Sequence, residues 1–177
     1  RHRPGRRGRS RPAVHPDRRR DVSVRAGTHH RECRRSVPTL GGVEPADALG
    51  AAGLILVGET TDPFSLEAVR ATMGSLFHLP LVRLPQSDFI VFAEKWGSAF
   101  SGKVTGTHLK GVIDHRAIDY SAGPQLLLMG NEQQGLTDEL AAACDQLAFI
   151  AMDGAADSLN LAIATGIMLF EARRHAL

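Results

Sequence analysis

The chain has 177 residues, of which 43% are hydrophobic, and a formal net charge of +2, values that suit one domain with a sizeable core and exclude two large domains. Only two cysteines are present, Cys33 and Cys144, and they form no C-x-x-C motif, so we expect neither a disulfide scaffold nor a metal site. Because no apolar run reaches the roughly 18 residues of a membrane span and no secretory signal is recognisable, we expect a soluble, cytoplasmic protein.

The first part of the chain differs in composition from the rest. Residues 1–40 hold 13 Arg against 3 acidic groups, whereas residues 41–177 hold 8 Lys and Arg against 16 acidic groups. Abundant Arg, Pro, Gly and His without apolar periodicity predict a basic, disordered segment over 1–44, followed by a folded domain over 45–177. A basic arm on an acidic body is typical of a nucleic-acid tether, in which Arg and Lys neutralise phosphates.

The folded part alternates short apolar runs with segments of helical period. In chain order we expect the last turn of a helix at 45–49, a strand at 53–57, a helix at 65–73, a strand at 81–84, a helix at 87–100, strands at 103–107, 111–114 and 125–129, a helix at 137–144, a strand at 147–151 and a closing helix from residue 158. Such alternation predicts an α/β fold with a mainly parallel sheet and helices on both faces.

Capping residues suggest where three of these helices begin. Asp62 followed by Pro63 is typical of a helix start, Thr137 precedes two acidic residues, and Ser158 precedes the apolar closing helix. Within residues 87–100, Phe89 and Trp96 belong to a face of three-and-four spacing, which we interpret as core packing and not as a base-stacking platform.

Three predicted strands end in polar or glycine-bearing turns, at 105–107, 130–132 and 152–154. The carboxyl ends of parallel strands meet at one edge of the sheet, and ligands bind there. We therefore expect backbone groups of these turns to hold an adenine and its ribose.

Two motifs give this edge a more specific interpretation. Residues 127–136 read Leu-Leu-Met-Gly-Asn-Glu-Gln-Gln-Gly-Leu, and residues 157–164 read Asp-Ser-Leu-Asn-Leu-Ala-Ile-Ala. Both motifs in this order, before a closing helix, resemble the SPOUT class of RNA methyltransferases, specifically the SpoU/TrmH-like ribose 2′-O-methyltransferases. Residues 50–83 also resemble this family, so that the similarity covers about residues 46–175.

The resemblance implies a C-terminal trefoil knot, S-adenosylmethionine as cofactor, rRNA or tRNA as substrate, and a homodimer. It implies a cofactor site formed by Thr107, Leu128, Gly130, Ile150, Met152 and Leu159. It also favours catalytic roles for four residues. Asn131 would hydrogen-bond the substrate or cofactor, Glu132 would fix the loop or orient a partner, and Ser158 and Asn160 would position the ribose.

Each of these residues also has a structural interpretation. Asn131 and Glu132 are compatible with a turn after Gly130, while Ser158 is equally suited to cap a helix and Asn160 to satisfy an amide of its first turn. The resemblance favours function for these four residues, and both interpretations stay open for Thr107. We interpret His78, His108 and His115 as surface or core residues, because their spacing suggests no partner.

The resemblance breaks before residue 46. Family members carry there a strand, an Asn and an Arg implicated in activating the hydroxyl, whereas Glu44 falls about where this chain should have the Arg. Either the basic segment is a natural RNA-binding extension, or it results from a shifted reading frame, which its composition favours and which predicts that a core strand is lost. A non-catalytic RNA-binding or assembly protein that retains the cofactor pocket is therefore the alternative function. A dinucleotide-dependent oxidoreductase is disfavoured, because no G-x-G-x-x-G follows a strand.

Overall fold

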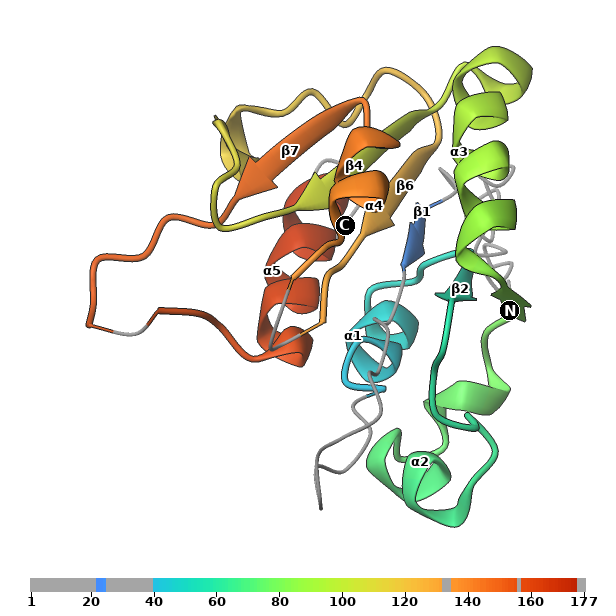
Figure 1. Ribbon diagram of the computed structural model, residues 1–177. Helices are drawn as coiled ribbons and strands as arrows, with labels where there is room; N and C mark the ends of the chain where they lie inside the picture. Colours follow the sequence, from blue (N-terminus) through green and yellow to red (C-terminus); the bar gives the residue numbers. More distant parts are fainter. Residues whose placement is uncertain (1–21, 25–39, 132–134, 156, 175–177) are drawn as a thin grey trace, which may run out of the picture.

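The protein, seen here as a computed structural model, is described over residues 22–24, 40–131, 135–155 and 157–174 (Figure 1). Its strands form one sheet in the order β3-β2-β1-β6-β4-β7-β5, and all of the pairings are parallel. The strands are β1 (Val22–Val24), β2 (Gly53–Val57), β3 (Leu81–Leu84), β4 (Lys103–Thr107), β5 (Ile113–Asp114), β6 (Gln125–Leu128) and β7 (Gln146–Phe149).

Helices cover both faces of this sheet. They are α1 (Val43–Ala48), α2 (Leu66–Ala71), α3 (Gln86–Phe100), α4 (Asp138–Ala142) and α5 (Leu161–Arg173), with short 3-10 turns η1 (Ser75–Phe77) and η2 (His115–Ala117). In Figure 1, α4 lies in front of the sheet and α5 behind it, with α1 beside α5. The predicted α/β fold with a mainly parallel sheet is confirmed, whereas the threading of a knot stays a prediction. Among the described helices, none has the length and apolar character needed to cross a membrane.

The two sides of the sheet form two separate cores, and β6 contributes to both. Leu127 and the following Met129 pack with residues of α1 and α5, whereas Leu126 and Leu128 pack with residues of α3 and α4. Successive side chains of a strand point to opposite faces, so the three leucines of this central strand serve both cores, and the preceding Gln125 is buried as well. The aromatic face of α3 is core as predicted, since Phe89 and Trp96 are buried against β4 and β6.

Several helix starts differ from the prediction. Ser65, and not Asp62, caps α2, because the Ser65 hydroxyl accepts from the backbone N–H of Ala68 at 3.3 Å. Asp62 instead accepts from the N–H of Phe64 and forms a local turn. Thr137 caps α4 as predicted, with its hydroxyl 3.3 Å from the N–H of Leu140.

The basic segment contributes a strand that the sequence did not predict. Val22–Val24 forms β1, which pairs with β2 on one side and β6 on the other. The expectation of disorder throughout 1–44 is therefore wrong at these residues, and so is the expectation that the core strand is lost. The segment also ends earlier than expected, since Leu40 and Val43 are buried in the core. Residues 1–21 and 25–39 lie outside the described part.

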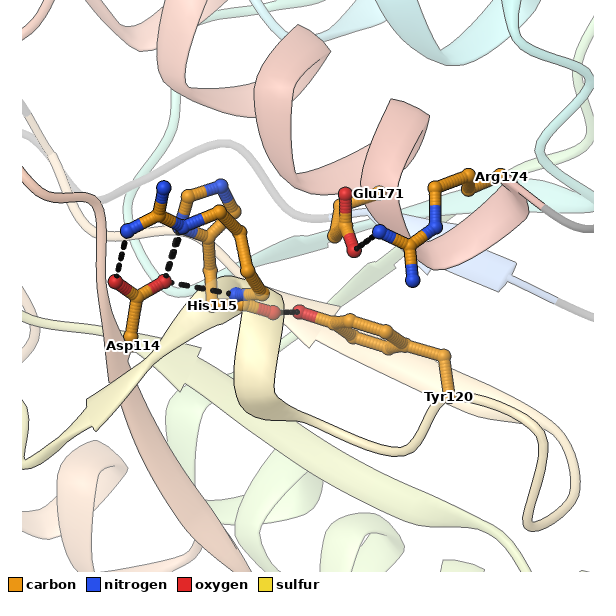
Figure 2. A network of polar contacts seen from close by, with 6 residues as sticks. Asp114, His115, Tyr120, Glu171 and Arg174 are labelled. Carbon is orange, nitrogen blue, oxygen red and sulfur yellow. Dashed lines mark hydrogen bonds and ion pairs between the residues drawn. The ribbon is translucent and has the colours of Figure 1, made fainter.

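A buried tyrosine lies between β5, η2 and the end of α5 (Figure 2). The Tyr120 hydroxyl donates to the carbonyl oxygen of His115 at 3.1 Å. Asp114 accepts three hydrogen bonds from Arg116, which hold the pKa of its carboxyl well below the usual range. Burial raises the pKa of Tyr120, and the negative charges of Glu171 and Asp114 raise it further.

Because the chain has a single tyrosine, the pKa of Tyr120 can be measured directly. The unfolded chain ionises it near the ordinary pKa of 10.0, whereas the folded protein keeps it protonated to higher pH. A raised folded-state pKa stabilises the protein below about pH 10, and this contribution is lost as the pH rises further. We expect Tyr120→Phe to abolish this alkaline loss and to lower the free energy of unfolding at neutral pH by about 1 kcal/mol, since the His115 carbonyl loses its donor.

The measurement is urea unfolding of both proteins from neutral pH to above about pH 10, together with the near-ultraviolet absorbance of tyrosinate in the folded wild type. Tyrosinate absorbance that rises at the ordinary pKa while the protein is still folded would contradict this account.

Candidate functional site

A cavity of about 610 Å³ opens at the carboxyl edge of the sheet, where β4, β6 and β7 end. Its walls come from the turn after β4, the loop after β6, the segment after β7 and the start of α5. This is the edge at which ligands bind in open parallel sheets, and the volume falls within the range of about 300–1,000 Å³ that is usual for small-molecule sites.

The loop after β6 closes on itself through two backbone hydrogen bonds. Asn131 and Gly135 exchange N–H···O bonds of 3.1 Å in both directions. A Cβ on Gly130 would lie 2.7 Å from both Gly135 Cα and Leu136 N, so only glycine fits there, and Gly135 has a φ of +71°. These contacts hold Gly130, Asn131 and Gly135 close together, and all three residues line the cavity.

The start of α5 forms another wall of the cavity. Asn160 caps this helix, because its Oδ1 accepts from the N–H of Ala162 at 2.9 Å. The sequence placed the helix start at Ser158, which instead lies two residues before the cap, is exposed and lines the cavity. Asn160 thus has the capping role, and it holds the N-terminal end of α5 beside the cavity.

The structure brings most of the predicted site residues together. Seven of them line the cavity: Thr107, Gly130, Asn131, Ile150, Met152, Ser158 and Leu159. Thr107 donates its hydroxyl to the carbonyl oxygen of Leu128 at 3.4 Å, which ties the ends of β4 and β6 together. Asn160 is next to the cavity as the cap, and Glu132 lies outside the described residues.

Leu128 is the predicted cofactor residue whose side chain lies elsewhere. It is fully buried on the α3 and α4 face of the sheet, while its neighbour Met129 lines the cavity from the other face. Strand alternation explains this placement, so Leu128 can contribute backbone atoms only.

Sequence reasoning missed two polar residues of the cavity, His108 and Lys110. Both follow β4 directly, where a polar turn at a strand end was the available signal. His108 Nδ1 accepts from the N–H of Lys110 at 2.9 Å, so a neutral His108 ring carries its proton on Nε2. The surface or core role predicted for His108 is therefore incomplete, because this side chain both lines the cavity and fastens the turn.

Glu44 lies on the first turn of α1, close to the start of α5. A Cβ on Gly41 would lie 3.4 Å from the N atom of Ala162, and one on Gly166 would lie 3.9 Å from Pro45 Cβ. The first turn of α1 therefore runs along the first turns of α5, and Glu44 on it is exposed. A carboxylate there cannot supply the positive charge that the family resemblance leads us to expect from an arginine.

Comparison with known proteins agrees with this geometry. A profile of the SpoU rRNA Methylase family matches residues 44–170. The chain belongs to this family. Among curated relatives, a 23S rRNA (uridine(2479)-2′-O)-methyltransferase of Streptomyces viridochromogenes is 38% identical over 139 residues, which are 76% of this chain and 47% of the relative. The 23S rRNA (guanosine(2553)-2′-O)-methyltransferase RlmP of Bacillus subtilis (strain 168) is 30% identical over 74% of this chain and 51% of the relative.

Solved structures of SpoU-family members share the fold. An AdoMet-bound rRNA methyltransferase from Sinorhizobium meliloti is 52% identical with a TM-score of 0.78, over 93% of this chain and 59% of that one. The SpoU methyltransferase AviRb from Streptomyces viridochromogenes, in complex with AdoMet, is 36% identical with a TM-score of 0.75, over 91% of this chain and 62% of that one. The chain spans about half the length of the curated relatives that it matches.

The tight contact at Gly130 gives a test of how the SpoU-family loop is built. We expect Gly130→Ala to lower the free energy of unfolding by about 1–3 kcal/mol, because the new methyl group overlaps the backbone of Gly135 and Leu136. Gly154→Ala is the matched control, since nothing lies within 4 Å of a Cβ there. Urea unfolding of the wild type and both variants measures the difference. Equal stability of the two variants would show that the loop relaxes freely.

Proposed function

We propose that this protein transfers the methyl group of S-adenosylmethionine to a ribose 2′-hydroxyl of RNA, with rRNA as the first substrate class. The observation that supports this most directly is the cavity at the ends of β4, β6 and β7, in which the residues of both family motifs meet. The relatives named as 23S rRNA 2′-O-methyltransferases support the reaction, and the two AdoMet-bound structures support the cofactor.

The described residues fit this cofactor. Apolar side chains of Met129, Ile150, Leu159 and Leu161 line one part of the cavity and suit an adenine ring. Backbone groups at the ends of β4 and β7, near Thr107 and Met152, would bond the edge of the ring and the ribose hydroxyls.

The bound cofactor supplies an already activated methyl group, so the protein has mainly to align the acceptor and exclude water. Asn131 from the β6 loop and Ser158 before α5 line the cavity from two sides, and both have side chains that can hydrogen-bond a ribose. Asn160 fixes the N-terminal end of α5 and thereby the position of Ser158. A requirement for the 2′-hydroxyl would make the protein select RNA over DNA.

His108 is a poor acceptor for the hydroxyl proton. Its Nδ1 is occupied by the N–H of Lys110, and Nε2 of the neutral ring carries a proton. We therefore assign His108 to the structure of the turn. For Glu132 we keep the role that the family motif implies, which is to fix the loop after β6 or to orient a partner.

The test is transfer of labelled methyl groups from S-adenosylmethionine to RNA, with the modified nucleosides identified after digestion. We expect 2′-O-methyl nucleosides in RNA and no transfer to DNA of the same sequence. We propose that the side-chain amide of Asn160 also contacts the ribose, beside the capping role of its Oδ1. Asn160→Ser keeps a capping oxygen but removes this amide, so we expect normal stability and transfer reduced by about 100-fold through misalignment of the ribose. We expect Ser158→Ala to act in the same direction.

Urea unfolding of each variant separates loss of alignment from loss of fold. Asn160→Ala is the informative comparison, because it removes the cap and should also cost about 1 kcal/mol of stability. Transfer at the wild-type rate by both Asn160→Ser and Ser158→Ala would show that these residues do not align the ribose.

A second function, RNA binding or assembly without catalysis, is favoured by Glu44 alone. A carboxylate on the exposed first turn of α1 would repel both the RNA phosphates and a developing alkoxide. This function predicts that the wild type binds S-adenosylmethionine and RNA but transfers no methyl group to any RNA.

The family resemblance implies a homodimer, and we further propose that its two copies associate through α5. Glu171 and Arg173 are the charged residues among the residues of α5, while Ile163 and Phe170, seven residues apart on its outer face, are 54% and 56% exposed. A helix that is apolar all round is usually buried, so this outer face calls for a partner. A second copy would cover it and bring two cavities close to one interface.

Replacing Phe170 tests the dimer. We expect Phe170→Glu to shift the protein from dimer to monomer in sedimentation velocity, because a buried unpaired carboxylate costs several kcal/mol at an interface. Val91→Glu on α3 is the matched control, since Val91 is 48% exposed on another helix. A monomeric wild type, or equal behaviour of the two variants, would overturn the α5 interface.

A further inference from the structure

A lysine lies at the mouth of the cavity, on the turn that follows β4. Lys110 is exposed and lines the cavity together with His108 and Leu109. Among the described lining residues, it is the one that carries a fixed charge. An anion that enters the cavity therefore meets a single cationic side chain in the described part of its wall.

The turn that carries Lys110 is fastened to β7. The His108 N–H donates to the carbonyl oxygen of Ala148 at 2.9 Å, and the Gly111 N–H donates to the carbonyl oxygen of His108 at 2.9 Å. A Cβ on Gly111 would lie 2.6 Å from the carbonyl carbon of Ala148, so the turn packs directly on the strand. With the bond from Lys110 N–H to His108 Nδ1, the backbone position of the lysine is preorganised.

Most other cations of the acidic body are engaged. Arg116 pairs with Asp114, Arg174 with Glu171 and Lys103 with Asp145, while Arg173 donates to the carbonyl oxygen of Gly50. No ion pair joins Lys110 to a carboxylate of the described residues. The exposed cations Arg70, Arg83 and Lys95 are likewise without such a pair, but they do not line the cavity.

The proposed acceptor, a ribose of RNA, would bring an anion to the mouth of the cavity. Every internal ribose of RNA carries a phosphodiester on its 3′ oxygen, next to the 2′-hydroxyl, so a hydroxyl that enters the cavity carries a phosphate to its mouth. We propose that Lys110 binds the phosphate on the 3′ side of the ribose whose hydroxyl enters the cavity. This inference rests on the proposed function and adds a positioning residue to it, since phosphate contacts fix the register of a nucleic acid.

The test compares Lys110→Gln with Lys95→Gln, a matched control on the exposed surface of α3. We measure the dissociation constants for RNA at several salt concentrations, the dissociation constant for S-adenosylmethionine by calorimetry, and the KM and kcat of methyl transfer. For Lys110→Gln we expect RNA binding weakened by about fivefold, a salt slope lowered by about 1, a raised KM for RNA and unchanged affinity for S-adenosylmethionine. Lys110→Arg should restore binding, because it keeps the charge.

Two outcomes would overturn the proposal. If Lys110→Gln weakens S-adenosylmethionine binding and leaves the salt slope for RNA unchanged, the lysine binds the carboxylate of the cofactor instead. If Lys110→Gln and Lys95→Gln have the same salt slope, Lys110 contacts no phosphate. Failure of the proposed function is seen separately, in a wild type that transfers no methyl group whatever its salt slope.

Discussion

The central position of β6 is the constraint on which the rest of the molecule depends. Its four residues are all buried between β1 and β4, with side chains directed alternately into the two cores. Burial of each leucine contributes about 1.5–3 kcal/mol, so the register of β6 is fixed by both cores at once. The chain then passes directly from Met129 into Gly130 and Asn131, which line the cavity. The same packing that stabilises the domain therefore positions one wall of the site.

Close packing at two glycines shapes the other walls, against side chains at Gly106 and against backbone at Gly111. A Cβ on Gly106 of β4 would lie 2.7 Å from Cys144 Sγ, and Gly111 allows the turn after β4 to lie on the backbone of β7. A side chain at Gly111 would push the turn away from the backbone of β7, and one at Gly106 would displace the side chains of Cys144 and Leu147, so the cavity between the strand ends would change shape. The cavity is thus a consequence of how closely the strands pack.

The apolar runs predicted the ends of each strand from residue 53 onward to within two residues. A strand of a parallel sheet covered on both faces is a nearly continuous apolar run, which makes it easy to recognise. Helix caps were harder to predict, since Asp62 and Ser65, or Ser158 and Asn160, are equally able to cap, and the path of the chain decides between them. Strand alternation in residues 125–129 would have placed Leu128 away from the cavity. β1 was missed because it has only three residues within an Arg-rich segment. Lys110 was missed because it lies in a stretch without hydrophobic periodicity.

On the first turn of α1, different residues serve packing and chemistry. Val43 and Ala46 are fully buried and hold α1 in place, while Arg173 near the end of α5 donates to the carbonyl oxygen of Gly50 just beyond α1. Glu44 takes no part in this packing, because it is exposed on the outer side of the same turn. A change of its charge would therefore alter the electrostatics beside the start of α5 without moving the helix that carries it. A catalytic and a non-catalytic member of the family can consequently share this fold, and the charge on the first turn of α1 can distinguish them.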